Sequence, residues 1–159
     1  MQDSTPPPSD ALVIFGITGD LAFKKIFPAL ENLERRGRLP GIVVGVARGG
    51  TTREALLERM RQSLAKHGDE VCESAAARLA GKLRMVDGDY RDDATFAALR
   101  KALDGAARPC HYLAIPPSLF GPVVEQLQRA GCTAGARVIV EKPFGRDLAS
   151  ARQLNAILH

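Results

Sequence analysis

Three small residues at regular spacing, Gly16, Gly19 and Ala22, could form a turn that binds a phosphate group. In such a turn Gly16 permits a tight bend, Gly19 lets a pyrophosphate approach the backbone, and Ala22 lets the next helix pack closely. The free N–H groups and partial positive charge at the helix N-terminus would attract the phosphates. The spacing is G-x-x-G-x-x-A rather than G-x-G-x-x-G, so an ordinary turn with Asp20 as the helix N-cap stays open as an alternative.

Arg48 is the second candidate, because it follows an apolar run from Ile42 to Ala47 that is typical of a buried strand. At this position of a dinucleotide-binding fold, an acidic residue binds the ribose 2′-hydroxyl of NAD, whereas an arginine accommodates the 2′-phosphate of NADP. Gly49 and Gly50 follow, and they leave room for a bulky phosphate. The pattern therefore favours NADP. An arginine that lies along the surface at a strand end is the alternative.

Asp89 and Tyr90 follow a third apolar run, at the place where the adenine of a dinucleotide would lie. Tyr90 could stack on the base, and Asp89 could accept a hydrogen bond from its amine. A solvated turn explains the pair equally well.

Lys142 follows the fifth apolar run and lies between Glu141 and Pro143. A lysine at such a strand end could bind a phosphate or a substrate hydroxyl as a compact cation. A structural ion pair between Lys142 and Glu141 is the alternative. Lys25, one turn into the first helix, could point to the same cleft, although a surface lysine is the more usual explanation. The sequence shows no Ser/His/Asp arrangement and no His-rich metal cluster, and we expect His111 to be packed in the interior.

The elements that must position these residues alternate along the chain. Short apolar runs predict strands over residues 11–15, 42–47, 83–86, 111–115 and 137–140. Helical spacing predicts a first helix over residues 21–36, with Leu21, Ile26, Leu30 and Leu33 as core positions. Further helices are predicted over residues 52–83 (two, separated near residues 67–68), 92–103, 118–130 and from 147 onward.

This alternation of strands and helices predicts an α/β fold. Strands that are apolar on both faces form parallel sheets covered by helices. We therefore predict a doubly wound parallel sheet with helices on both faces, in a single domain over residues 11–159. Ligands of such sheets bind at the carboxyl ends of the strands. Residues 1–10 are polar and rich in proline, and they predict a disordered leader.

The composition fits one domain in a reducing compartment. The chain has 159 residues, 45% of them hydrophobic, and a net charge of +4. Because its arginines are scattered, we expect no nucleic-acid partner. Cys72, Cys110 and Cys132 lack C-x-x-C spacing, so we expect reduced thiols and neither disulfide nor zinc. We find no signal peptide and no apolar run long enough to span a bilayer, and so expect a cytoplasmic protein without a membrane partner.

Four segments together resemble the amino-terminal, NADP-binding domain of the glucose-6-phosphate dehydrogenase family. They are residues 13–22 with Lys24 and Lys25, residues 44–48, residues 112–117 and residues 141–148. The segments occur in the family's order and cover nearly the whole chain from residue 11 onward. The last two are more specific than any glycine pattern. The resemblance implies a Rossmann-type sheet.

The resemblance also implies coenzyme contacts for individual residues. Arg48 would bind the adenosine 2′-phosphate, Asp89 and Tyr90 would lie near the adenine, and Ile115 with Pro116 would lie along the nicotinamide. The pyrophosphate would be held by the loop after the first strand, which consists of Gly16, Ile17, Thr18, Gly19, Asp20, Leu21, Ala22 and Phe23.

On the substrate side, the resemblance implies that Lys142 bridges coenzyme and glucose 6-phosphate, with Lys25 near the sugar phosphate. Two positions depart from the family pattern. Phe23 replaces a basic residue found in many members, and Phe120 replaces a tyrosine that contacts the coenzyme in some. Neither change removes an essential charge, so only the finer coenzyme contacts are affected.

The family oxidises glucose 6-phosphate to 6-phosphogluconolactone with NADP in the pentose phosphate pathway, and the complete enzyme is expected to be a homo-oligomer. Its general base lies in an R-I-D-H-Y-L-G-K-E segment, which these 159 residues do not contain. We therefore expect no catalytic residue and no substrate domain in this chain, and no activity from it alone. The alternatives are a non-catalytic dinucleotide-binding module, or another sugar oxidoreductase with a Glu-Lys-Pro motif.

Overall fold

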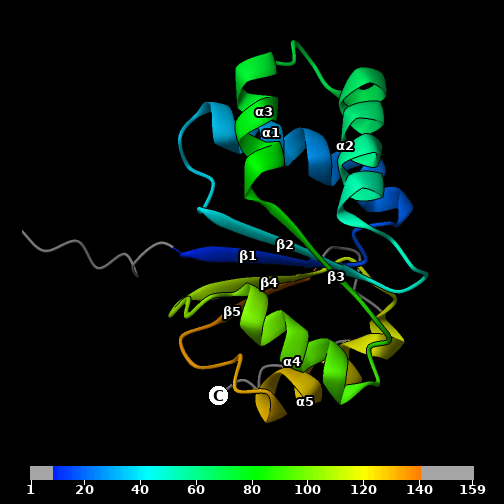
Figure 1. Cartoon of the computed structure of the whole chain (residues 1–159), viewed down its shortest axis with the longest axis vertical. Helices are drawn as coiled ribbons and strands as arrows, with labels where there is room; N and C mark the ends of the chain where they lie inside the picture. The colour runs from blue at the N-terminus through cyan, green and yellow to red at the C-terminus, as the bar shows by residue number, and fades with distance from the viewer. Residues whose placement is uncertain (1–8, 141–159) are drawn as a thin grey trace, which may run out of the picture.

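The computed structural model describes residues 9–140, which form one parallel β-sheet between two layers of helices (Figure 1). The strands lie in the order β3-β2-β1-β4-β5, and every neighbouring pair is parallel. The order reverses direction at β1, so the carboxyl ends of β1 and β4 mark the switch point where sheets of this class bind ligands. The strands are β1 (Ala11–Phe15), β2 (Ile42–Ala47), β3 (Leu83–Asp87), β4 (Pro109–Leu113) and β5 (Arg137–Val140).

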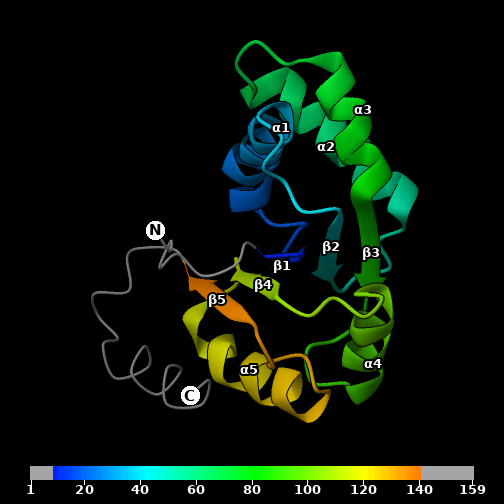
Figure 2. The same ribbon diagram turned by 90° about the vertical axis from the view of Figure 1, so that its left-hand side faces the viewer.

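The helices divide between the two faces of the sheet (Figures 1 and 2). One face is covered by a π-helical turn η1 (Ala22–Ile26) and the helices α1 (Phe27–Arg35), α2 (Arg53–His67) and α3 (Glu73–Lys82). The other is covered by α4 (Asp93–Ala102) and α5 (Phe120–Arg129), the latter preceded by a short 3-10 turn η2 (Pro117–Leu119). This arrangement confirms the predicted doubly wound sheet.

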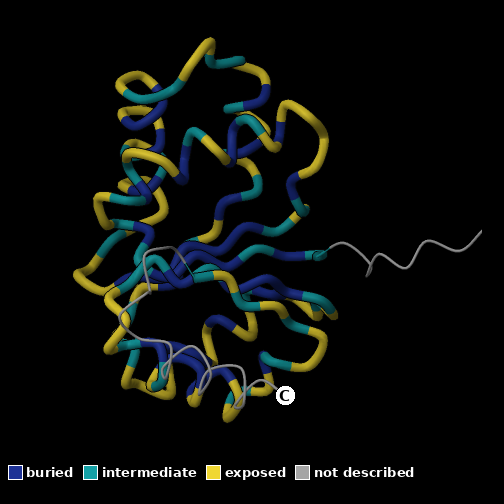
Figure 3. Tube along the Cα trace, turned by 180° about the vertical axis from the view of Figure 1, so that it is seen from behind, coloured by how far each residue is buried: buried dark blue, intermediate teal, exposed yellow. Residues whose placement is uncertain are grey.

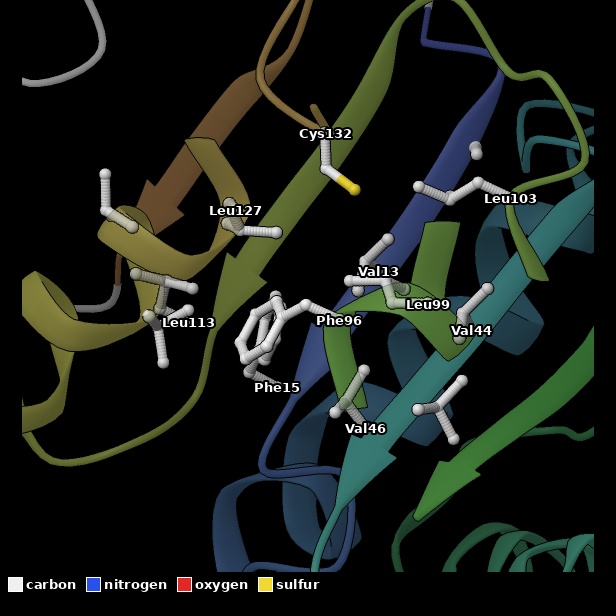
Figure 4. Close-up of a cluster of buried hydrophobic side chains, with 14 of the residues drawn as sticks. Val13, Phe15, Val44, Val46, Phe96, Leu99, Leu103, Leu113, Leu127 and Cys132 are labelled. Carbon is white, nitrogen blue, oxygen red and sulfur yellow. The ribbon is translucent and has the colours of Figure 1, made fainter. Parts of the chain in front are cut away.

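The strands β1, β2 and β4 are largely buried from both sides, as Figure 3 shows along the centre of the molecule. Toward α4 and α5, Phe15 stacks on Phe96 with ring centroids 6.0 Å apart, inside a cluster that includes Leu113 and Leu127 (Figure 4). Toward α1, α2 and α3, a second cluster surrounds Phe27. Burial of such apolar surface is the main driving force for folding. It also fixes the strand ends on which the site is built.

Several predicted boundaries are confirmed. The bounds of β1, β2 and β5 are those predicted, and α2 ends at His67, with Gly68 as its C-cap. Asp92 caps α4, because its side chain accepts a hydrogen bond from the Ala94 N–H at 3.0 Å. Residues 1–8 of the predicted leader lie outside the described residues. Asp10 accepts hydrogen bonds from the backbone of residues 107 and 108, both at 2.8 Å.

The prediction for the fourth strand was wrong by two residues. It placed the strand at 111–115, whereas β4 begins at Pro109 and ends at Leu113, where it pairs with Phe15 at the end of β1. Proline is tolerated as the first residue of a strand, because it only removes one donor there. Beyond Leu113 the chain leaves the ladder to pass over the turn at Gly16.

The first helix also differs from its prediction. Its first part is the π-helical turn η1, and α1 follows with Pro28 in its first turn. Proline has no N–H to donate to the carbonyl four residues earlier, which accounts for the irregular start. Leu33 was wrongly predicted as a core residue and is 37% exposed. The buried side of α1 carries Leu30, Glu31 and Glu34 instead, because both carboxylates pair with basic side chains.

Candidate functional site

The turn after β1 requires glycine at its first position. Gly16 has a positive φ of 83°, and its N–H donates to the Val46 carbonyl at 2.9 Å. A Cβ at this position would lie 2.1 Å from the Ala114 carbonyl oxygen. Glycine is the residue that accepts both the positive φ and this close approach. The ends of β1, β2 and β4 therefore meet at Gly16.

Gly19 presents its backbone where the first helical turn begins. Its N–H donates to the Gly16 carbonyl at 2.9 Å, and its own carbonyl accepts from the Phe23 N–H at 3.2 Å. Gly19 and Asp20 are exposed, whereas Ala22 is fully buried beneath the turn. Backbone N–H groups at the start of a helix bind anions well. The turn therefore has the shape and the polarity that a bound phosphate needs.

The side chains of the loop differ in their access to a ligand. Ile17 has no exposed surface and fills the space over Gly45, where a Cβ would lie 2.9 Å from the Ile17 Cγ2 atom. Ile17 thus shapes the turn from within. Thr18 and Leu21 are half-buried.

Helix α2 packs against this turn through residues that the sequence analysis did not single out. Arg59 Nη2 donates to the Gly19 carbonyl at 3.0 Å, and its guanidinium carbon lies 4.9 Å from the centre of the Phe23 ring. Ser63 Oγ donates to the Phe23 carbonyl, and His67 meets the Phe23 ring edge-on with centroids 5.5 Å apart. The available signal was their spacing of four residues, which places all three on one helix face.

Arg48 and Asp89 meet beyond the carboxyl ends of β2 and β3. Arg48 Nη1 lies 3.5 Å from Asp89 Oδ2, and the two side chains are 75% and 48% exposed. The other Asp89 oxygen accepts the Arg91 N–H at 2.8 Å, which fixes the carboxylate. An exposed ion pair of this kind contributes only about 0–1 kcal/mol. Arg48 can therefore turn toward an incoming phosphate at little cost.

The loop after Arg48 is open on its outer side and anchored on its inner side. Gly49 and Gly50 have positive φ angles, and a Cβ on either would meet no atom within 4 Å. The N–H groups of Gly50 and Thr51 donate to Asp87 Oδ1 at 3.0 and 3.1 Å. The predicted room beside Arg48 is thus present.

Tyr90 packs against the turn that follows β1, unlike the residue of a solvated loop. Its hydroxyl donates to the Val46 carbonyl at 3.3 Å, the same oxygen that accepts the Gly16 N–H. Its ring meets Phe15 edge-on at 5.8 Å. Burial is the main cause of a raised pKa of the Tyr90 hydroxyl. Contact with adenine stays a prediction.

Three other predicted residues lie on the β4 side of the turn. Ile115 is half-buried and touches the space above Gly16, where a Cβ would lie 3.1 Å from the Ile115 Cγ2 atom. Pro116 is exposed and accepts the Leu119 N–H at 2.9 Å. Phe120, which replaces a tyrosine of the family pattern, is buried in the core cluster.

The structure describes only one of the two lysines that are predicted to contact the substrate. Lys25 is exposed on η1, six residues after Gly19. Lys142, with Glu141 and Pro143, lies outside the described residues.

The described residues include possible metal ligands and three cysteines. Within residues 9–140, no three His, Cys, Asp or Glu side chains come together in a group that could hold a metal ion. Cys72, Cys110 and Cys132 are unpaired, and the last two are buried. Among the described helices, none has the length and apolar character that a membrane crossing needs.

The sheet order, the helix layers and the glycine turn at the switch point define a dinucleotide-binding α/β domain of the Rossmann type. The model of the family described as "Glucose-6-phosphate dehydrogenase, NAD binding domain" matches residues 13–159. The chain belongs to this family.

Known relatives agree with this assignment. The chain is 44% identical over 158 residues to glucose-6-phosphate 1-dehydrogenase 1 of Mycobacterium tuberculosis, covering 99% of the chain and 34% of that protein. It is 36% identical to glucose-6-phosphate 1-dehydrogenase 5, cytoplasmic, of Arabidopsis thaliana, covering 92% of the chain and 32% of that protein. The chain thus spans about a third of the length of these relatives.

Solved structures give the same result. The crystal structure of glucose-6-phosphate 1-dehydrogenase from Mycobacterium avium superposes with a TM-score of 0.85 at 49% identity, over 95% of this chain and 34% of that one. A glucose-6-phosphate dehydrogenase in complex with its substrate glucose 6-phosphate gives a TM-score of 0.79 at 32% identity, over 98% of this chain and 35% of that one.

Proposed function

We propose that this chain is the NADP-binding domain of a glucose-6-phosphate dehydrogenase. The observation that carries the choice of NADP is Arg48, which is 75% exposed at the end of β2. Open space lies over the two glycines that follow it. A guanidinium can donate two hydrogen bonds to a phosphate, and it keeps its charge at any physiological pH.

The Asp89 carboxylate, which pairs with Arg48, opposes the approach of an anion. This carboxylate belongs to the loop after β3 and already accepts the Arg91 N–H. A dianionic phosphate offers Arg48 a stronger partner than one exposed carboxylate at 3.5 Å. The exchange of partners therefore favours NADP binding.

The rest of the coenzyme would follow the edge of the sheet. The exposed backbone at Gly19 and Asp20 would hold the pyrophosphate, while Tyr90 and Asp89 would lie near the adenine. Ile115 and Pro116, beside Gly16, would border the nicotinamide, which supplies the hydride acceptor when bound.

The reaction that we propose this domain to serve is the oxidation of glucose 6-phosphate to 6-phosphogluconolactone. Lys25 and Lys142 would contact the substrate, because both are cations expected near the nicotinamide end of the site. We place the proton-accepting base outside this chain, since its sequence lacks the Arg-Ile-Asp-His segment of the family. The domain would then bind and orient the coenzyme.

Calorimetric titration of the 159-residue chain with NADP and with NAD tests this proposal. We expect NADP to bind about 10–150-fold more tightly, the value of a charge-assisted contact of roughly 1.5–3 kcal/mol. Raised salt should weaken NADP binding more than NAD binding. Equal affinities for the two coenzymes would contradict the proposal.

A further inference from the structure

The carbonyl of Gly19 is held by two donors from different parts of the chain. The Phe23 N–H reaches it from within the helical turn at 3.2 Å, and Arg59 Nη2 reaches it from α2 at 3.0 Å. In a trans peptide the N–H points opposite to the C=O. Fixing the Gly19 carbonyl therefore also fixes the direction of the Asp20 N–H, one of the exposed amides at the start of the helix.

Arg59 is itself held in place by its surroundings. Its guanidinium carbon lies 4.9 Å from the centre of the Phe23 ring, a cation–π contact. Phe23 is in turn fixed by Ser63, which donates to its carbonyl, and by the edge-on ring of His67. The guanidinium thus has little freedom to leave the Gly19 carbonyl.

Arg59 is half-buried, and one of its nitrogens is withdrawn from solvent. Its Nε atom is buried and has no hydrogen-bond partner among the described residues. A buried donor without a hydrogen-bond partner is unfavourable. The contacts with Gly19 and Phe23 offset this cost, so the position of Arg59 is tied to the conformation of the turn.

We propose that Arg59 is a positioning residue for the coenzyme pyrophosphate. It acts through the Gly19 peptide: a hydrogen bond from a cation to the carbonyl polarises the amide and strengthens the Asp20 N–H as a donor. It also keeps the turn in the binding conformation before the ligand arrives, which lowers the entropic cost of binding. The inference rests on the proposed function, because it assigns the pyrophosphate to this turn.

This role predicts an effect on ligand affinities that differs from the effect predicted for Arg48. Arg59 acts on the pyrophosphate, which NADP and NAD share, whereas Arg48 acts on the 2′-phosphate alone. Arg59→Ala should weaken NADP and NAD equally, by about tenfold, the value of one hydrogen bond to a charged group. It should leave adenosine 2′-monophosphate unaffected, because this ligand carries the 2′-phosphate without the pyrophosphate.

The chain offers a matched control on the same helix. Arg61 is 62% exposed and pairs with Glu58 at 3.4 Å. Arg61→Ala removes the same charge from α2 and should leave all three affinities unchanged. Arg59→Lys keeps the charge and one donor but loses the flat guanidinium over Phe23, so we expect an intermediate loss for both coenzymes.

The experiment is calorimetric titration of the 159-residue chain and these variants with NADP, NAD and adenosine 2′-monophosphate, with thermal unfolding as a check of folding. If Arg59→Ala does not fold, Arg59→Lys carries the test. Wild-type affinities in a folded Arg59 variant would overturn the inference, and so would an equal loss for all three ligands. A wild-type chain that binds neither coenzyme would overturn the proposed function, before any variant is measured.

Discussion

Arg48 and Asp89 form an ion pair across the carboxyl ends of two neighbouring strands, with 3.5 Å between Nη1 and Oδ2. The pair lies where the adenosine ribose of a dinucleotide is expected. Each residue therefore makes a separate prediction about coenzyme choice.

Replacing Arg48 should remove the preference for NADP. Arg48→Ala should weaken NADP binding by about 10–150-fold, because it deletes a charge-assisted contact with the 2′-phosphate. NAD binding should be nearly unchanged, since NAD lacks that phosphate. Titration of wild type and variant with both coenzymes checks this. A variant that loses both coenzymes equally would show that Arg48 has another role.

Replacing Asp89 should have the opposite effect. Asp89→Asn keeps an oxygen for the Arg91 N–H but removes the negative charge beside Arg48. We expect NADP to bind about two- to fivefold more tightly, in line with the small energy of an exposed ion pair. NAD affinity should stay the same. Unchanged or weaker NADP binding in the Asp89→Asn variant would contradict this prediction.

Much of the fold could be predicted from the sequence, because the strands of this parallel sheet are rich in apolar residues. Their continuous apolar runs located β1, β2 and β5 without error. The runs could not locate β4, whose end is set by pairing with Phe15 and by the crossing at Gly16. Leu33 was misassigned because helical periodicity cannot reveal that two glutamates occupy the buried side of α1.

The residues of the candidate site also divide into those that the sequence could locate and those that it could not. Gly16 and Arg48 could be found because each lies directly after its strand, where local sequence reports position in the sheet. Arg59 could not, because its contact with Gly19 spans 40 residues and depends on how α2 packs. The sequence gives only a weak signal for residues that act from a neighbouring helix. Here that signal is the four-residue spacing along α2.

The buried carboxylate of Glu34 predicts a stability effect at Lys82. Lys82 Nζ lies 2.5 Å from Glu34 Oε1 and also donates to the Leu39 carbonyl at 3.2 Å. The Glu34 side chain is only 5% exposed, so Lys82→Met would leave a buried charge with a weaker partner. We expect a loss of about 3 kcal/mol in the free energy of unfolding, measured by urea denaturation.

Arg78 provides the control for this prediction. It also faces Glu34, but at 4.0 Å and with 53% of its side chain exposed. Arg78→Met should cost less than about 1 kcal/mol. The double variant Glu34→Gln with Lys82→Met should recover part of the loss, since it removes both charges. Equal effects of the Lys82 and Arg78 substitutions would show that the short contact carries no special stability.

His111 should make the domain less stable in mild acid. It has no exposed surface, and because a carbonyl can only accept, its Nε2 donates to the Cys132 carbonyl at 2.9 Å. Nδ1 is buried without a hydrogen-bond partner in the described chain, so protonation would put an unpaired charge in the core. Burial accordingly lowers the pKa of His111 below its usual value.

The direction of the pH effect follows from proton uptake in the two states. The unfolded chain binds a proton at His111 near pH 6.5, whereas the folded chain binds it only at lower pH. The contribution of His111 to the free energy of unfolding is therefore fully present above about pH 6.5. It falls as the pH drops toward the folded pKa, by up to about 1.4 kcal/mol per pH unit. His111→Gln keeps an N–H donor but cannot titrate, so it should remove this part of the slope. Urea denaturation of both proteins between pH 8 and pH 5 measures it, and parallel curves would contradict the assignment.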